Sequence, residues 1–316
     1  MNFVEGASAD HLGFEAYKAN TDSPVEVLEN VDMFKRATTA IDKLCPKLEF
    51  VVNQTGAKAY GCHLLQHRPS WLVPPFAEDT PRLEGANAAT LFYYPQLDWL
   101  EEFAKDKPWS WVETRPDIIT GFVPNQNFYS LNMALGFFFS LYREINGEGA
   151  ECPFPGSSKS WVAKFHDSSA AMNAREAIHV CLSPTTRKGD AFNVADEKEH
   201  HSWETKWPAL CSLFGLKGVK REEDNPIEVR QYIRDNKATW EAMEDKYGLR
   251  RGHADNPRIF PGFEYFLLTQ FDFDRQYDMR KLYEGSGFPE EREATRGWRD
   301  TFERMKQAKM IPSGFK

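Results

Sequence analysis

Two short predicted strands, each set between segments with helical spacing, constrain the fold of this chain more than any other feature. Residues 48–52 are a short apolar run rich in β-branched side chains, and residues 109–114, closed by Arg115-Pro116, form the second strand. Short continuous apolar runs of this kind are typical of strands buried on both faces of a parallel sheet. Strands that alternate with helices predict a doubly wound α/β fold, in which ligands bind at the carboxyl ends of the strands. We therefore expect functional residues in the loops that follow Val52 and Thr114.

The segments around these strands predict the rest of the architecture. Residues 24–45 have helical spacing, with Asp22 or Ser23 as the cap and Pro24 in the first turn. Further helices are expected at residues 88–105, 128–145, 168–181, 202–214 and 226–247, and a further strand at residues 190–195. We divide the chain into residues 1–125, a partial Rossmann-like domain, and residues 126–316, a mostly helical substrate lobe that returns residues 188–196 to the sheet.

Composition excludes several classes of protein. The 316 residues are 41% hydrophobic and 27% charged, as in globular enzymes, and the net charge of −8 argues against nucleic acid or an anionic membrane as partner. The longest apolar stretch, around residues 131–141, is too short to span a bilayer. Five scattered cysteines without a C-x-x-C pair, and no secretory signal, predict a reduced cytoplasmic protein without a structural zinc.

Two polar clusters resemble sites but have simpler explanations. His200 and His201 follow acidic residues, yet no further histidine stands at ligand spacing, so we interpret them as solvated loop residues and expect no metal. His166-Asp167-Ser168 contains the residue types of a hydrolase triad, but adjacent residues cannot form that geometry. We expect Asp167 or Ser168 to cap the following helix.

Three motifs in a fixed order carry the functional signal. They are Thr55-Gly56-Ala57-Lys58 after the first strand, Phe92-Tyr93-Tyr94 at the start of a helix, and Arg115-Pro116-Asp117-Ile118-Ile119 after the second strand. Together with the Pro-Pro-Phe-x-Glu-Asp-x-Pro-Arg run at residues 74–82 and the Ala-Phe-Asn-Val-Ala-Asp run at 191–196, they resemble the progesterone 5-beta-reductase/iridoid synthase group of extended short-chain dehydrogenases, fungal natural-product reductases included. The resemblance runs from about Phe14 to the C-terminus.

The resemblance implies a set of site residues. Lys58 and Tyr93 would be the catalytic pair and Tyr94 a bystander, although an alignment shifted by one place would exchange the two tyrosines. Thr55 and Gly56 would pass close to an NADPH cofactor. Pro116 and Ile119 would lie along its nicotinamide.

The residue types fit reduction of a hydrophobic small molecule. Hydride delivery to an enone or a carbonyl places negative charge on an oxygen, which a phenol stabilises or protonates. A neighbouring ammonium is expected to lower the pKa of that phenol and to hold a ribose hydroxyl. A homodimer is compatible with the sequence.

The glycine-rich turn that holds a dinucleotide pyrophosphate is missing from the expected place, between a leading strand and its helix. The resembling family carries it in a segment that would precede Phe14, so we expect an incomplete Rossmann-like sheet. Three explanations remain open: a truncated product, a partner chain that supplies the missing half, or a fold reused as a cofactor-free isomerase, cyclase or silent binding protein.

Overall fold

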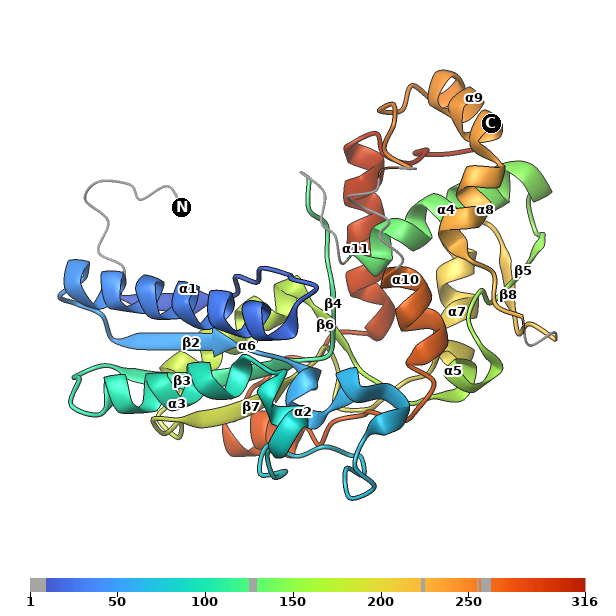
Figure 1. Cartoon of the computed structure of the whole chain (residues 1–316). Coiled ribbons are helices and arrows are strands. Elements are labelled where there is room, and N and C mark those ends of the chain that lie inside the picture. The colour runs from blue at the N-terminus through green and yellow to red at the C-terminus, as the bar shows by residue number, and fades with distance from the viewer. Residues whose placement is uncertain (1–9, 125–129, 223–224, 255, 257–262, 316) are drawn as a thin grey trace. The chain divides into compact units, whose positions relative to one another are not determined.

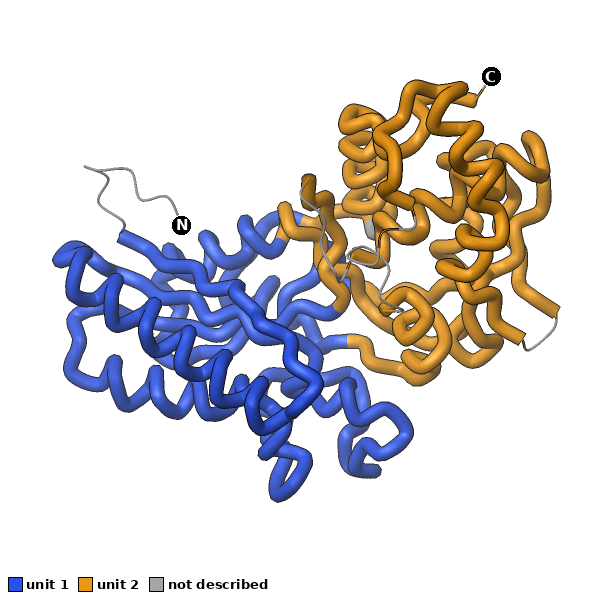
Figure 2. Tube along the Cα trace, turned by 45° about the horizontal axis from the view of Figure 1, so that its top comes forward, with its two compact units in different colours: residues 1–117, 173–198, 277–290 blue, residues 118–172, 199–276, 291–316 orange. Residues whose placement is uncertain are grey.

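The structure, a computed structural model, describes residues 10–124, 130–222, 225–254, 256 and 263–315. The chain forms two compact units, which Figure 2 shows in different colours. Unit 1 comprises residues 1–117, 173–198 and 277–290, and unit 2 comprises residues 118–172, 199–276 and 291–316. Each unit has its own hydrophobic core.

Unit 1 is built on a four-stranded parallel sheet, as the alternating pattern predicted. Its strands lie in the order β1 (His11–Phe14), β2 (Phe50–Gln54), β3 (Ser110–Pro116) and β7 (Asp190–Val194). All three neighbouring pairs are parallel. The carboxyl ends of the strands therefore meet at one edge of the sheet, where the loops after β2 and β3 begin.

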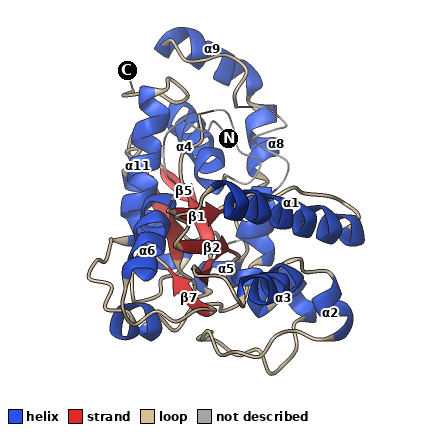
Figure 3. Cartoon of the chain, turned by 90° about the vertical axis from the view of Figure 1, so that its left-hand side faces the viewer, coloured by secondary structure: helices blue, strands red, loops and turns tan. Residues whose placement is uncertain are grey.

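Helices cover both faces of this sheet. The helices α1 (Ser23–Leu44) and α3 (Tyr93–Ala104) lie on one face, and α6 (Ala170–Leu182) lies on the other (Figure 3). Helix α1 begins as predicted, because the Asp22 side chain accepts a hydrogen bond of 3.1 Å from the Val25 amide. The core under α1 and α3 is built mainly from Leu12, Phe14, Phe34, Ile41, Val51, Leu97, Leu100 and Trp111.

Two predicted helices are each divided in two. The segment predicted as one helix at 88–105 overlaps the last two residues of α2 (Gly85–Ala89) and, after a break, contains α3. The break places Pro95 in the first turn of α3, where its missing N–H has no helical partner to lose. Residues 226–247 likewise hold α8 (Val229–Asp235) and α9 (Lys237–Tyr247), separated at Asn236.

Unit 2 is mostly helical around α4 (Leu131–Asn146), in which every residue from Leu131 to Leu141 is buried. This part of the helix therefore belongs to the core of unit 2. Figure 1 labels most of the surrounding elements. They are α5 (Ser158–Val162), α7 (Trp203–Ser212), α8, α9, α10 (Phe263–Tyr265), the π-helix η3 (Phe266–Gln270), α11 (Ala294–Gln307), and two strand pairs, β4 (Ile118–Thr120) with β6 (Asp167–Ser169) and β5 (Glu151–Pro153) with β8 (Lys217–Val219).

The predicted roles of Asp167, Ser168 and His201 were wrong. Asp167 and Ser168 belong to strand β6, and it is Ser169 whose hydroxyl accepts from the Met172 amide at 3.4 Å. Asp167 instead accepts two hydrogen bonds from Lys206. His201 is not solvated: its side chain is 10% exposed and its ring lies 3.4 Å from Asp167, although His200 is exposed as expected.

Candidate active site

The site begins at Gly56, directly after β2. Its φ of +151° lies in a region that favours glycine. A Cβ placed on Gly56 would lie 3.2 Å from the carbonyl oxygen of Pro116 and 3.5 Å from the hydroxyl oxygen of Tyr93. The end of β2, the end of β3 and the first residue of α3 thus meet around one residue without a side chain. The sequence motifs that carry Gly56, Pro116 and Tyr93 are brought together in unit 1.

The two neighbouring tyrosines have different surroundings. The hydroxyl of Tyr94 accepts from the Leu83 amide and donates to the Ala59 carbonyl, both at 3.0 Å. The hydroxyl of Tyr93 makes no hydrogen bond to any residue within the described ranges. Tyr94 therefore ties the Lys58 loop to the loop before α3, whereas the Tyr93 hydroxyl has no such structural bond within the described ranges. This difference favours Tyr93 as the functional tyrosine.

Burial controls the acidity of Tyr93. Its pKa lies above the ordinary value of a tyrosine because of burial, followed by the negative charges of Glu113 and Glu26. The expected lowering by a neighbouring ammonium is not found. A phenol with a raised pKa is fully protonated near neutral pH, so Tyr93 is suited to donate a hydrogen bond or a proton rather than to accept one.

Lys58 lies on the 3₁₀ helix η1 (Ala57–Tyr60), which follows Gly56 immediately. Its ammonium is half-buried and lies 5.2 Å from the centre of the Tyr17 ring. Burial lowers the pKa of Lys58, and the charge of Glu26 opposes that shift. His63, on η2 (Cys62–His67), lies near enough for the Lys58 charge to act on it. Burial, with the Lys58 charge second, lowers the pKa of His63 to about 4, so its imidazole is neutral at pH 7.

A buried chain of hydrogen bonds holds the loop after β2 in place. Thr55 donates to Glu113 at 2.5 Å, and Arg115 donates to the other Glu113 oxygen at 2.7 Å. Arg115 also donates to the Tyr60 hydroxyl at 3.0 Å, which in turn donates to Asn193 on β7 at 2.6 Å. Thr55 and Tyr60 bracket Gly56 and Lys58. The side chains of β3 and β7 therefore fix both ends of the segment that carries the lysine.

The sequence placed Arg115 in the third motif but indicated no role for it or for Glu113. Glu113 lies inside the predicted strand at residues 109–114, where a charged side chain is a signal of a buried partner. Tyr17 was missed because β1, only four residues long, was not recognised as a strand. Its position after the carboxyl end of β1 is the signal that would have found it.

Ile119 belongs to a different compact unit from the other predicted site residues. It is part of β4 in unit 2, where it pairs in register with Ser168 and is 40% exposed. Thr55, Gly56, Lys58, Tyr93 and Pro116 all belong to unit 1.

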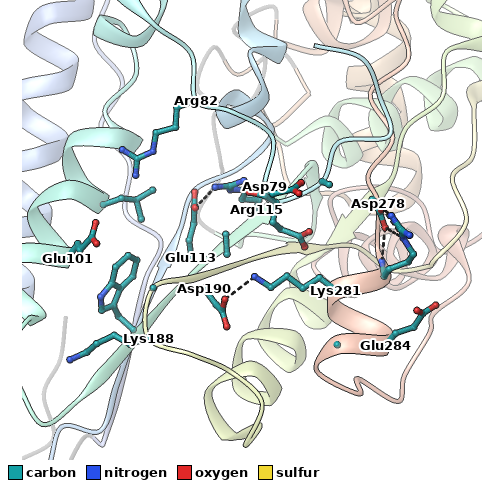
Figure 4. A pocket seen from close by; sticks show the side chains of 18 residues that line it. Asp79, Arg82, Glu101, Glu113, Arg115, Lys188, Asp190, Asp278, Lys281 and Glu284 are labelled. Carbon is teal, nitrogen blue, oxygen red and sulfur yellow. Dashed lines mark hydrogen bonds and ion pairs between the residues drawn. The ribbon is translucent and has the colours of Figure 1, made fainter. Parts of the chain in front are cut away.

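A separate cavity of about 900 Å³ lies in unit 1, on the side of Glu113 and Arg115 (Figure 4). Some of its charged walls are paired internally, since Lys281 contacts Asp190 at 3.0 Å and Arg115 contacts Glu113 at 2.7 Å. Neither Lys58 nor Tyr93 lines it. The cavity is therefore separate from Gly56, Lys58 and Tyr93, although Arg115 of the third motif lines it.

The sequence of this chain is similar to those of known proteins. A family model described as a PRISE-like Rossmann-fold domain matches residues 6–312. The chain belongs to this family. Among the curated relatives, the short chain dehydrogenase ausT of Aspergillus calidoustus is 32% identical over 289 residues, covering 90% of this chain and 69% of that protein.

Plant enzymes are similar over much of the chain. The (S)-8-oxocitronellyl enol synthase ISY1 of Nepeta racemosa is 29% identical, covering 76% of this chain and 59% of its own. The 3-oxo-Delta(4,5)-steroid 5-beta-reductase of Arabidopsis thaliana is 28% identical, covering 91% and 72%. As a member of the PRISE-like family with such relatives, the protein is an enzyme of the short-chain dehydrogenase/reductase class.

Solved structures support the fold. RMD from Pseudomonas aeruginosa, complexed with NADPH, matches with a TM-score of 0.60 over 96% of this chain and 83% of that chain, at 9% identity. At that identity the likeness concerns the Rossmann fold alone.

The PRISE-like fold implies a nicotinamide cofactor, and the described residues fit one end of it. A Cβ on Gly56 would crowd the Pro116 carbonyl oxygen and lie 3.5 Å from the Tyr93 hydroxyl, so glycine at this position keeps these two polar atoms clear of a side chain at the strand ends. The pyrophosphate end is not matched within the described ranges, because residues 15–22, between β1 and α1, contain no glycine. Within these ranges there is also no cluster of three His, Cys, Asp or Glu side chains that could hold a metal ion, and no helix long and apolar enough to cross a bilayer.

Proposed function

We propose that this PRISE-like protein is an NADPH-dependent reductase of an activated C=C or C=O bond in a hydrophobic small molecule of secondary metabolism. One observation carries the proposal. The Tyr93 hydroxyl lies close to Gly56, near the Pro116 carbonyl, and makes no hydrogen bond within the described part of the chain. Lys58 lies on the 3₁₀ helix that follows Gly56. The names of the relatives, which include reductases and short chain dehydrogenases, support it.

Tyr93 would act on the oxygen that becomes negatively charged during reduction. Its raised pKa keeps the phenol protonated, so it donates to that oxygen throughout the step. A donor placed at a developing oxyanion typically accelerates the reaction about 10²–10³-fold. NADPH, when bound, supplies the hydride.

Lys58 would have two roles. Its ammonium donates hydrogen bonds to a ribose hydroxyl, and its positive charge favours the oxyanion. Thr55, Gly56 and Pro116 would form the wall of the nicotinamide site. The hydrogen bonds of Thr55 to Glu113, and of Tyr60 to Asn193, hold this wall before a ligand arrives.

The test is a titration of the whole chain with NADPH, followed by ligand fluorescence and by the thermal unfolding midpoint. We expect saturable binding that is weakened by Lys58→Ala. Lys18→Ala is the matched control, because Lys18 is exposed and pairs with Glu29. A folded parent chain that shows no saturation would contradict the proposal for this chain. Equal binding by Lys58→Ala and the parent would contradict the role given to Lys58.

A further inference from the structure

The loop between β1 and α1 brings two residues without an assigned role to the site. Tyr17 donates a hydrogen bond of 2.6 Å to Oε1 of Glu26, which lies in the first turn of α1. The amide of Asn20 donates to the same oxygen at 3.1 Å. A carboxylate at a helix N-terminus is also favoured by the helix dipole. Glu26 is therefore a fixed negative charge, and it orients the Tyr17 ring.

The Tyr17 ring links this carboxylate to the catalytic pair. Lys58 places its ammonium 5.2 Å from the ring centre, within the range of a cation–π contact. Phe92 lies against the same ring at 5.5 Å, nearly parallel to it, and contacts Tyr93 edge-on at 4.9 Å. The contacts thus form one series, from Glu26 through Tyr17 to Lys58 on one branch and to Tyr93 on the other.

The charge of Lys58 depends on Glu26 and on the Tyr17 ring. A half-buried ammonium loses hydration, which favours the neutral amine. Among the groups that act on Lys58, Glu26 is the one that favours the cation. Tyr17 contributes the face of its ring, and His63, on the side of η2, is neutral at pH 7.

We propose that Glu26 and Tyr17 are positioning residues that hold the Lys58 ammonium charged and in place over the Tyr17 ring. Neither residue contacts the reacting atoms in this arrangement; both act through Lys58. The consequence for reduction rests on the proposed function, whereas the effect on Lys58 itself does not.

The experiment measures the titration of Lys58 directly in the whole chain. Lysine amines are converted to ¹³C-dimethylamines, and their chemical shifts are followed by NMR against pH; the Lys58 signal is the one that Lys58→Arg removes. We expect Glu26→Gln to move the Lys58 midpoint to lower pH. Tyr17→Phe, which keeps the ring but loses the hydroxyl that fixes Glu26, should move it in the same direction by less.

Glu29→Gln is the matched control. Glu29 lies on the same helix, pairs with Lys18, and accepts from Asn20, so this variant loses an ion pair in the same loop. Its Lys58 midpoint should equal that of the parent. The proposal is overturned if Glu26→Gln, folded by circular dichroism, leaves the midpoint unchanged, or if Glu29→Gln shifts it as much.

A kinetic measurement separates this proposal from the proposed function. If the parent reduces a substrate, Glu26→Gln should shift the alkaline limb of the pH–rate profile to lower pH, and Glu29→Gln should not. If the parent shows no turnover, the reductase proposal fails while the NMR titration still decides whether Glu26 controls Lys58.

Discussion

Asp167 accepts two hydrogen bonds from the ammonium of Lys206, at 2.9 and 3.0 Å, and both side chains are 1% exposed. The Trp298 indole donates to the same carboxylate at 2.8 Å. The rings of Phe165 and Trp203 lie 4.1 and 4.3 Å from the ammonium. The pair therefore joins β6, α7 and α11 inside unit 2.

Lys206→Met should destabilise the protein strongly. It leaves the Asp167 carboxylate buried without its cation, and breaking one side of a buried ion pair typically costs about 3–5 kcal/mol. Lys246→Met, which breaks the more exposed pair with Glu144, should cost far less because water screens an exposed pair. Urea unfolding curves of both variants test the difference, and similar midpoints for the two would contradict it.

Tyr94→Phe should lower the stability of the protein, whereas Tyr93→Phe should lower its activity. Tyr94→Phe removes the hydrogen bonds to Leu83 and Ala59, so we expect a loss of about 1–3 kcal/mol in the free energy of unfolding. Tyr93→Phe removes no hydrogen bond within the described part of the chain and should leave stability nearly unchanged. If the protein is a reductase, Tyr93→Phe should lower kcat about 10²–10³-fold. Denaturation and steady-state kinetics on both variants decide the assignment, which is reversed if Tyr94→Phe is the inactive, stable one.

Gly56→Ala should be more harmful than another glycine substitution with unusual backbone geometry. The new Cβ would crowd the Pro116 carbonyl and fill the space beside Tyr93, in addition to about 1–3 kcal/mol of backbone strain. Gly85→Ala is the control, because Gly85 has a φ of +58° but nothing within 4 Å of the added atom. We expect NADPH binding to be lost only with Gly56→Ala, as measured by fluorescence titration.

The stability of unit 1 should fall with rising pH because of Glu176. Burial, followed by the charge of Asp196, raises the pKa of Glu176 well above its usual value. The folded state then holds a proton that the unfolded state releases, so this contribution is complete below about pH 4.5 and is lost as the pH rises.

Glu176→Gln should therefore gain stability relative to the parent as the pH increases from about 4.5 to 8. The amide oxygen can still accept from the Ala195 amide, as Glu176 does at 3.2 Å. Glu290→Gln, at an exposed pair with Arg175, should show no such trend. Unfolding midpoints measured across this range check the prediction, and a difference that shrinks as the pH rises would contradict its sign.

Local patterns in the sequence predicted the elements whose causes are local. Helix α1 followed from its cap at Asp22, its proline and its spacing, β2 from its apolar run, and β3 from the segment closed by Arg115-Pro116. Strand β1 was missed because four residues carry too little pattern, and the break before α3 because Pro95 was not weighed as a first-turn residue.

The site was only partly predictable because its decisive contacts are long-range. The motifs named Lys58 and two adjacent tyrosines, but only the positions of Leu83 and Ala59 distinguish Tyr94 from Tyr93. The partners of Asp167 and His201 lie on α7, which no spacing near β6 indicates. Asp167 was therefore predicted to cap the helix beside it and His201 to be solvated, although both contact Lys206 on α7.

The bonds from Thr55 through Glu113, Arg115 and Tyr60 to Asn193 also have a consequence for backbone motion. Asn193 donates further to the carbonyls of Phe76 and Asp278, so segments from five parts of the chain share one set of bonds. Opening any one segment breaks bonds that hold the others. The amide protons along this edge of the sheet should therefore exchange with deuterium together, at a single protection level, rather than loop by loop.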